Sequence, residues 1–284
     1  MIQDILPQRM RNMFERKEPC DTDRLMCFSA DKILLRCNAM ITYPLYGDLR
    51  RWCAQKNEAD PQMIYLFSVG SAAYFLAKLP VEYTAALRQD GYEFVRMFDI
   101  RRLAPREEVF AAATAWHLYV WYRDNRFCGR CGRMLVHGES ERMLRCMDCG
   151  NIVFPKIAPA VIVGVTDGDK LLMTEYAGRE YKRYALIAGF TEIGETAEET
   201  VQREVMEEVG IRVKNIRYYK SQPWGFDMNL LMGFFCETDG EPEIHLDERE
   251  LSVAEWVKAG DIPDDTEGLS LTREMMSVFK SNFS

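Results

Sequence analysis

The chain has 284 residues, a hydrophobic fraction of 48%, a charged fraction of 28% and a formal net charge of −8. This composition is typical of a globular protein and leaves room for two domains and a small insert. The acidic balance argues against a protein that binds nucleic acid mainly by neutralising phosphates, although it allows a local basic groove.

Neither the first residues nor the most apolar run indicates export or membrane insertion. Residues 1–7 lack the basic start and the apolar core of a signal peptide. The apolar run from Met63 to Leu79 is interrupted by polar and small residues, so we expect a buried strand, a turn and further core. The expected location is the cytoplasm, where the nine cysteines would be reduced or bound to metal.

Residues 1–122 form a first predicted domain of α+β type, without a catalytic motif. Strands are expected at 32–37 and 63–69, and a helix at 107–122, where apolar side chains recur at helical spacing. His117 lies on this helix, and we interpret it as structural. Four further cysteines are scattered along this domain without the spacing that is typical of metal ligands. We expect them to be small, buried or half-buried residues: Cys20, Cys27, Cys37 and Cys53.

Residues 123–153 are predicted to form a zinc ribbon. Two Cys-x-x-Cys pairs, each followed by glycine, flank a short hairpin segment that turns near His137 and Gly138. Four thiolates suit tetrahedral zinc, whereas a redox site would need only one such pair. Because no position is left for water, one structural zinc ion per chain is expected. Its ligands would be Cys128, Cys131, Cys146 and Cys149.

Residues 154–284 form the third predicted domain, which combines strands with helices. The expected strands cover residues 160–165, 170–174, 184–188, 213–219 and 229–237. An Asp-Gly pair at 167–168 indicates a hairpin turn between the first two. A closing helix is expected at 271–279.

The stretch 189–211 contains a further predicted helix. Thr196 and Glu199 form a capping box that should start the helix near residue 197, and Gly210 is placed to end it. A row of valines can anchor this helix to a sheet: Val201, Val205 and Val209.

Three carboxylates share one face of that helix, because Glu204, Glu207 and Glu208 are spaced i, i+3, i+4. Like charges this close repel, and a divalent cation is the simplest group that would offset the repulsion. Oxygen ligands without Cys or His favour magnesium or manganese over zinc. The three carboxylates alone would favour a solvated acidic face. The glycines of the stretch, together with Glu195 and Arg203, favour the metal site.

The fixed residues of 189–211 resemble the Nudix box. That pattern runs Gly, five residues, Glu, seven residues, Arg-Glu, an aliphatic residue, any residue, Glu-Glu, any residue, Gly and an aliphatic residue, and every fixed position is filled. The resemblance implies an α/β/α sandwich that hydrolyses diphosphates, with Glu204 and Glu208 as first metal ligands and Glu207 as a ligand or assistant. Arg203 and Glu195 would pair to hold loop and helix together.

Glu250 is a further candidate metal ligand. It is expected to follow a strand and could reach the metals from the other side. The alternative is a plain surface carboxylate.

The segment 221–229, together with the cysteine pairs, resembles the NADH pyrophosphatase subgroup. Its signature reads Ser-Gln-Pro-Trp-Pro-Phe-Pro, any residue, Ser; here Gly225 and Asp227 replace prolines and Asn229 replaces serine. Fewer prolines make the loop less rigid. The resemblance implies hydrolysis of NAD(H) to nicotinamide mononucleotide and AMP by a homodimer. The candidate substrate contacts, with core packing as the alternative for each aromatic, are Phe190, Gln222, Trp224, Phe226 and Phe154.

Other functions stay open. Removal of the NAD cap from RNA 5′ ends cuts the same bond, and another dinucleotide or ADP-ribose would present a similar one. The non-enzyme alternative is a nucleotide-sensing, zinc-ribbon interaction protein, against which the intact carboxylate cluster argues.

Overall fold

The computed structural model describes residues 1–178 and 183–283, which divide into two units. The C-terminal unit comprises Met1, Ile157–Trp224 and Asn229–Ser284. The N-terminal unit comprises Ile2–Lys156 and Gly225–Met228, so it contains both the first predicted domain and the ribbon. No helix in the described ranges is long and apolar enough to cross a membrane.

Within the described residues, the C-terminal unit is built on a six-stranded mixed sheet of order β15-β16-β12-β13-β17, with β14 also paired to β12. The strands are β12 Ala158–Asp167, β13 Lys170–Tyr176, β14 Ile187–Phe190, β15 Val213–Trp224, β16 Asn229–Thr238 and β17 Leu251–Lys258. The β12–β16 pair is parallel. The strand expected at 184–188 is observed as β14, which begins only at Ile187. Ala185 does not belong to a strand, because it makes only an isolated bridge to Thr174. The sequence analysis did not predict β17.

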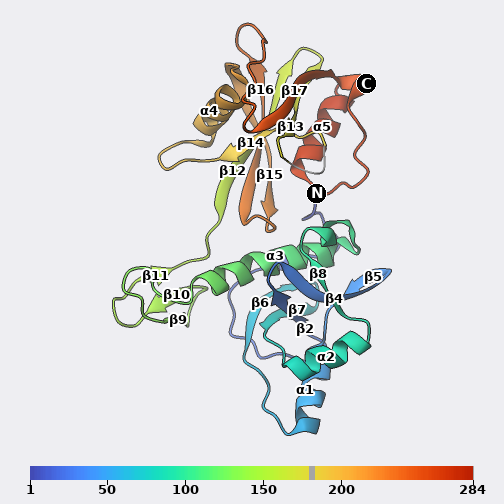
Figure 1. Cartoon of the computed structure of the whole chain (residues 1–284), viewed down its shortest axis with the longest axis vertical. Coiled ribbons are helices and arrows are strands. Elements are labelled where there is room, and N and C mark those ends of the chain that lie inside the picture. The colour runs from blue at the N-terminus through green and yellow to red at the C-terminus, as the bar shows by residue number, and fades with distance from the viewer. Residues whose placement is uncertain (179–182, 284) are drawn as a thin grey trace. The chain divides into compact units, whose positions relative to one another are not determined.

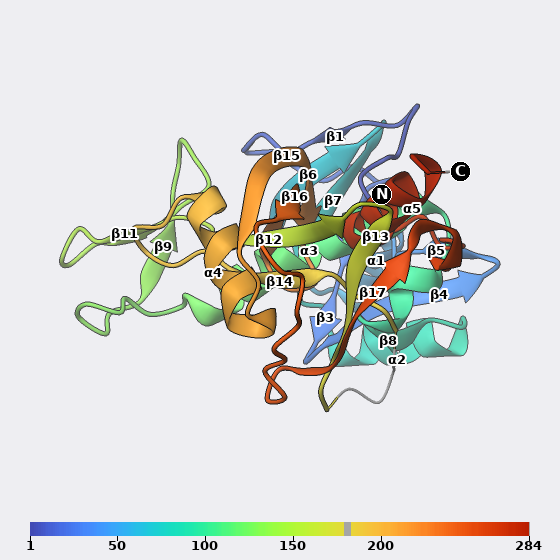
Figure 2. The ribbon, with the colours of Figure 1, turned by 90° about the horizontal axis from the view of Figure 1, so that it is seen from above.

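Helices α4 (Ala197–Val209) and α5 (Leu271–Ser281) cover opposite faces of this sheet (Figures 1 and 2). Alternate side chains of a strand point to opposite faces. One face of β12 shares a core with the valine row of α4: Val161, Val163, Val165, Val201, Val205 and Val209. On the other face, a Cβ added to Gly233 would lie 2.8 Å from Sδ of Met275 in α5. The predicted α/β/α layering is therefore confirmed.

Helix α4 begins and ends where the sequence predicts. The Thr196 hydroxyl accepts a hydrogen bond from the Glu199 amide at 3.2 Å, and the Glu199 carboxylate accepts one from the Thr196 amide at 2.8 Å. Gly210 ends the helix with a φ of 69°, in the left-handed region that favours glycine. These caps set which turns of the chain are helical and therefore which carboxylates share a face.

The N-terminal unit, all of whose residues are described, holds two four-stranded sheets, three α-helices and the ribbon. One sheet contains β1 Met10–Arg11, β6 Met63–Val69, β7 Ala72–Ala77 and β2 Arg24–Met26, and the other β3 Phe28–Ser29, β4 Lys32–Asn38, β5 Met40–Thr42 and β8 Glu93–Arg96. The helices are α1 Tyr46–Lys56, α2 Val81–Gln89 and α3 Arg106–Asp124. Strands β4 and β6 and helix α3 confirm the three elements that the sequence predicts.

A buried carboxylate links the elements of the N-terminal unit. Glu108 of α3 pairs with Arg24 at 2.9 Å and accepts a hydrogen bond from the Tyr74 hydroxyl at 2.8 Å. The Tyr43 hydroxyl donates to the Glu108 carbonyl oxygen at 2.9 Å. Burial raises the pKa of Glu108, and Arg24 acts in the opposite direction. Since its charge and hydrogen-bonding capacity are met inside the unit, we interpret Glu108 as structural.

The scattered cysteines correspond only in part to the expectation. Cys27 and Cys53 are buried, whereas Cys20 and Cys37 are exposed. His117 has the structural role expected of it, because its Nε2 atom lies 2.7 Å from the carbonyl oxygen of Lys156.

Gln222 joins β15 to the beginning of α5. Its side chain is fully buried, Nε2 donates to the Leu269 carbonyl at 2.9 Å, and Oε1 accepts from the Leu271 amide at 2.7 Å. The Leu271 amide is at the N-terminus of α5, where the helix itself offers no acceptor. The Gln222 amide therefore satisfies two interior backbone groups at once.

We predict that Gln222→Ala lowers the free energy of unfolding by about 2 kcal/mol, because it leaves both backbone groups without a partner. Urea denaturation measures the change. Gln202→Ala, on the exposed side of α4, is the matched control and should stay within about 0.5 kcal/mol of the wild type. Equal effects of the two substitutions would contradict the role of Gln222.

Candidate functional site

Helix α4 carries two of its three predicted ligands into the interior. Glu204 and Glu208 are 8% and 2% exposed, whereas the Glu207 side chain is 61% exposed. The structure thus brings the three carboxylates to one region of the helix but gives them unequal access to water.

Gly189 of β14 makes room for Glu204. A Cβ added at this glycine would lie 1.9 Å from the carboxylate carbon of Glu204 and 2.0 Å from its Oε1. Any residue other than glycine at position 189 would therefore displace the Glu204 carboxylate. The first glycine of the motif acts here by its lack of a side chain, and its φ lies outside the left-handed region.

Arg203 binds three carboxylates. Its Nε and Nη2 atoms lie 2.6 and 3.0 Å from the two carboxylate oxygens of Glu195, and Nη1 lies 2.8 Å from Glu204 and 2.9 Å from Glu207. Nη2 also donates to the Phe190 carbonyl at 2.8 Å. The hydrogen bonds from Arg203 are the main reason that the pKa of Glu195 is lowered to about 2. The predicted Arg203–Glu195 pair is confirmed, and the bonds to the other carboxylates add to it.

Glu208 is the most strongly perturbed carboxylate of the group. Burial, followed by repulsion from Glu204 and Glu250, raises the pKa of Glu208 to about 8, while a hydrogen bond with the Ala188 backbone acts the other way. Its Oε2 atom is buried and has no hydrogen-bond partner among the described residues. Buried polar atoms are nearly always bonded, and clustered carboxylate oxygens are the ligands that magnesium, manganese and calcium prefer. The donor chemistry of Glu204 and Glu208, carboxylate oxygens alone, therefore suits a divalent cation.

Burial is the main reason that the pKa of Glu204 and of Glu208 is raised, and the charge of Glu250 adds to the rise at both. The place of Glu250 in the chain differs from the expectation, because it directly precedes β17 and does not follow a strand. The carbonyl oxygen of Glu250 accepts a hydrogen bond from the Ala177 amide at 2.9 Å. The Glu250 side chain is exposed, so its role as a metal ligand stays a prediction beside the alternative of a surface carboxylate.

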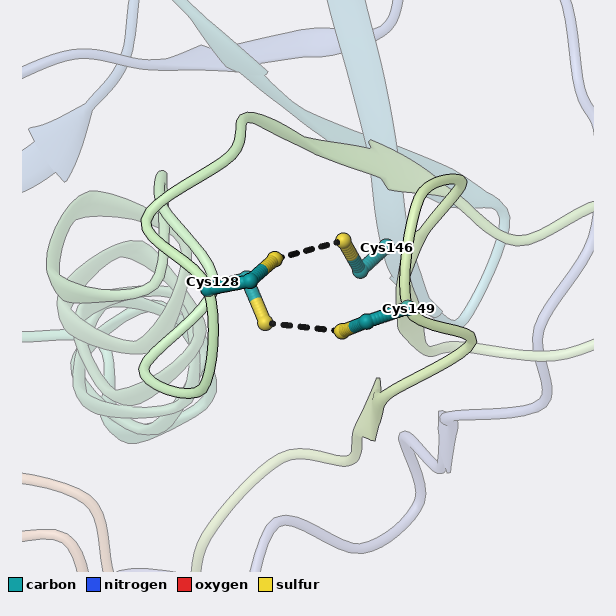
Figure 3. A group of neighbouring side chains, drawn as sticks. Cys128, Cys146 and Cys149 are labelled. Carbon is teal, nitrogen blue, oxygen red and sulfur yellow. Dashed lines mark hydrogen bonds between the residues drawn. The ribbon is translucent and has the colours of Figure 1, made fainter.

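The four predicted zinc ligands converge. Their Sγ atoms all lie within 4.8 Å of one another, with 3.6 Å between Cys128 and Cys149 and 3.5 Å between Cys131 and Cys146. Figure 3 shows the sulfur atoms of Cys128, Cys146 and Cys149 turned toward a common centre. Regular tetrahedral zinc with bonds of about 2.3 Å would separate sulfurs by about 3.8 Å. The four thiols therefore fit one zinc ion.

The ribbon backbone repeats one turn twice. The Gly132 amide donates to the Cys128 carbonyl at 2.8 Å, and the Gly150 amide donates to the Cys146 carbonyl at 3.0 Å. Both glycines have a positive φ, of 73° and 72°, as expected for the residue after each pair. The strands that carry these turns are β9 Leu135–His137, β10 Leu144–Cys146 and β11 Ile152–Val153.

Residues 156–277 match the NUDIX domain, and residues 123–154 match the NADH pyrophosphatase zinc ribbon domain. The chain therefore contains a Nudix domain, preceded by a zinc ribbon domain of the NADH pyrophosphatase type. Helix α4 and its flanking glycines are thus the Nudix box that the residue pattern resembles.

Curated relatives of this Nudix protein include two proteins named "NAD-capped RNA hydrolase NudC". The one from Enterobacter sp. (strain 638) is 41% identical over 143 residues, which cover 50% of this chain and 55% of the relative. The one from Klebsiella pneumoniae is 42% identical over 144 residues, with the same coverage. The chain therefore spans about half the length of the curated relatives it matches. A solved NUDIX hydrolase from Nitrosomonas europaea has a TM-score of 0.47 at 20% identity, covering 55% of this chain and 91% of that one.

The aromatic candidates for substrate binding are divided between the units. Phe190 and Trp224 belong to the C-terminal unit, and Phe154 and Phe226 to the N-terminal unit. Phe190 and Phe154 are 55% and 52% exposed, whereas Trp224 is buried. Phe226 is half-buried, and its carbonyl accepts a hydrogen bond from Nε1 of Trp116 at 3.3 Å. Phe190 and Phe154 are therefore the more accessible of the four aromatic candidates.

The segment 221–229 differs from the expected loop. Residues 221–224 continue β15, and only 225–228 form the turn. A Cβ on Gly225 would lie 2.2 Å from the Ala113 carbonyl oxygen within the N-terminal unit, so the proline of the signature would not fit here. Gln222, expected to contact substrate, is buried with its amide bonded to Leu269 and Leu271. We therefore assign Gln222 to the stability of the Nudix domain.

Stability of the magnesium- and manganese-free protein should depend on pH through Glu208. The pKa of this group is about 8 in the folded chain, against an ordinary value of 4.5. Between these values the unfolded chain releases a proton that the folded chain retains, so the free energy of unfolding falls as pH rises from about 4.5 to about 8. Glu208→Gln should flatten this decline and exceed the wild type in stability near pH 8. Urea denaturation between pH 4.5 and 8 measures the free energy of unfolding, with a variant of an exposed residue, Glu198→Gln, as control. If the free energy of unfolding of Glu208→Gln fell with pH as steeply as that of the wild type, the raised pKa would not belong to Glu208.

Metal analysis of the purified protein should find about one zinc ion per chain. Cys146→Ser should lose the ion and lower the melting temperature, since a ligand in the buried core of the ribbon is removed. Cys37→Ser changes an exposed cysteine outside the ribbon and should retain the zinc. A fully folded wild-type protein without zinc would refute the ribbon assignment.

Proposed function

We propose that this protein hydrolyses the diphosphate bond of NAD(H) to nicotinamide mononucleotide and AMP. The observation that carries the proposal is the buried pair Glu204 and Glu208, with one unpartnered carboxylate oxygen, in a Nudix domain that follows an NADH pyrophosphatase zinc ribbon. A non-catalytic nucleotide sensor would not need this costly group of carboxylates.

Diphosphate hydrolysis requires neutralised phosphate oxygens and an aligned, activated water. A divalent cation held by Glu204 and Glu208, with Glu207 and Glu250 beside them, supplies the neutralisation and the activation when it is bound. Arg203 keeps Glu204 and Glu207 in place through bonds of 2.8 and 2.9 Å. Glu207 is the most accessible carboxylate on the helix face, so we assign it the orientation of the attacking water.

Phe190 is our first choice for contact with a base of the substrate. Its ring is exposed, while its carbonyl is fixed by Arg203 at 2.8 Å, so the ring is held next to the residues of the Nudix box. Aromatic faces bind flat bases well. Trp224, Phe226 and Phe154 are kept as further candidates for the same role.

The names of the relatives favour a second candidate function, removal of the NAD cap from RNA. The same diphosphate bond is cut, so the same carboxylates would act. The net charge of −8 disfavours long contacts with RNA phosphates, and we propose that only the capped 5′ end is bound. Other dinucleotides and ADP-ribose present a similar bond and are the competing small substrates.

The finer parts of the proposal concern the metal, the assembly and the location. We propose magnesium or manganese as the catalytic ion, because all the donors are carboxylate oxygens. We also propose a homodimer in the cytoplasm, as the NADH pyrophosphatase resemblance implies. Exposed Ile193 and Met206 give the Nudix domain apolar surface that a partner subunit could cover. Sedimentation equilibrium tests the dimer, and cell fractionation tests the location.

With magnesium or manganese, the purified protein should convert NADH to AMP and the reduced mononucleotide, as followed by liquid chromatography. Glu208→Gln should lower kcat at least about 100-fold, because even outer-shell partners of metal ligands contribute 10–100-fold. Glu198→Gln, on the exposed side of the same helix, is the control and should keep wild-type turnover. Circular dichroism verifies that the variants are folded.

The absence of turnover at every metal concentration would refute the enzymatic proposal. Normal turnover in Glu208→Gln would refute the role of Glu208. Values of kcat/KM for NADH, NAD, ADP-ribose, diadenosine polyphosphates and NAD-capped RNA separate the candidate substrates. A higher value for NAD-capped RNA than for NADH would favour the second function.

A further inference from the structure

The segment 239–250 joins β16 to β17 without a helix or strand of its own, yet its backbone is attached to α4. The His245 amide donates to the Val209 carbonyl at 2.9 Å, and the Asp247 amide donates to the Glu208 carbonyl at 3.0 Å. Carbonyls in the last turn of a helix have no partner within the helix. The segment therefore completes α4 and is tied directly to the backbone of Glu208.

Asp247 also organises the turn that presents Glu250. Its carbonyl oxygen accepts hydrogen bonds from the amides of Glu250 at 3.1 Å and Leu251 at 3.0 Å. Its side-chain Oδ1 accepts from the Arg249 amide at 3.0 Å, which is the aspartate turn that stabilises such bends. The Ala177 amide holds the carbonyl of Glu250, so the turn is fixed on both sides.

The side-chain bond to the Arg249 amide matters more than the neighbouring ion pair. The Arg249 side chain is 91% exposed and lies 3.2 Å from Asp247, and exposed pairs contribute little. Hydrogen bonds from Arg249, the backbone amide first, lower the pKa of Asp247. The carboxylate therefore stays ionised and available as the acceptor of the turn.

We propose that Asp247 is a positioning residue that fixes the turn carrying Glu250 next to the C-terminal end of α4 and so sets the affinity of this centre for a divalent cation. The inference rests on the proposed function for the identity of the centre. Glu250 is exposed and extends from a segment without regular structure, so its carboxylate would sample many positions if the turn were loosened. The backbone bonds that run from Glu208 through Asp247 to Glu250, and the side-chain bond from Asp247 to the Arg249 amide, together limit that freedom.

Binding of Mn²⁺ to the full-length protein without substrate, followed by electron paramagnetic resonance of the free ion, tests the proposal. Asp247→Ala should raise the Kd on the order of 10-fold, as outer-shell changes do. Asp247→Asn keeps an oxygen acceptor and should stay near the wild-type value. Asp239 lies in the same segment and forms a surface ion pair with Lys214 of β15. Asp239→Ala removes only this pair and should leave the Kd unchanged.

A double-variant cycle distinguishes positioning from a general loss of structure. If Asp247 acts through Glu250, then Asp247→Ala should have little further effect on the Kd of Glu250→Gln. An equal loss in both backgrounds, or an unchanged Kd in Asp247→Ala, would overturn the proposal. A wild-type protein that binds no Mn²⁺ would refute the metal centre as well, whereas Mn²⁺ binding without NADH turnover would refute only the proposed reaction.

Discussion

Glu204 and Glu208 bring negative charge into a part of the Nudix domain from which water is largely excluded, and much of the domain is arranged around that constraint. Burying a carboxylate is unfavourable unless it is paired or protonated. Arg203 offsets part of the repulsion by binding Glu195, Glu204 and Glu207. Glu208 receives no such pair among the described residues, and its pKa rises to about 8.

The packing around α4 fixes the place of that charge. The valine row on one side of the helix is fully buried against β12, so the helix cannot rotate without exposing its core. The capping box and Gly210 fix its two ends. Gly189 then provides the space that the Glu204 carboxylate occupies. The core, the caps and one missing side chain therefore act together to hold two like charges side by side.

The ribbon shows a different way of stabilising structure. Its strands have only two or three residues, and its small core combines Trp121 with two of the cysteines. So small a core supplies little stability by itself, and metal ligation is the usual remedy. Arg142 adds a further link within the N-terminal unit, where Nη1 donates to Asn12 at 2.7 Å. The zinc ligands thus belong to the folding of that unit and not to the chemistry of the carboxylates.

The sequence by itself determined the features that depend on short spacing. The caps and carboxylate face of α4, each of the two Cys-x-x-Cys pairs and the Arg203–Glu195 pair join residues that are close in the sequence, so local geometry decides them. Only the tertiary structure decided the rest. It buried Glu208 but left Glu207 exposed, and it engaged Gln222 inside the domain. It also made Gly225 a site of close packing and attached Asp247, which starts the turn that carries Glu250, to α4. These outcomes depend on which distant segments pack together, and no local pattern of residues encodes that.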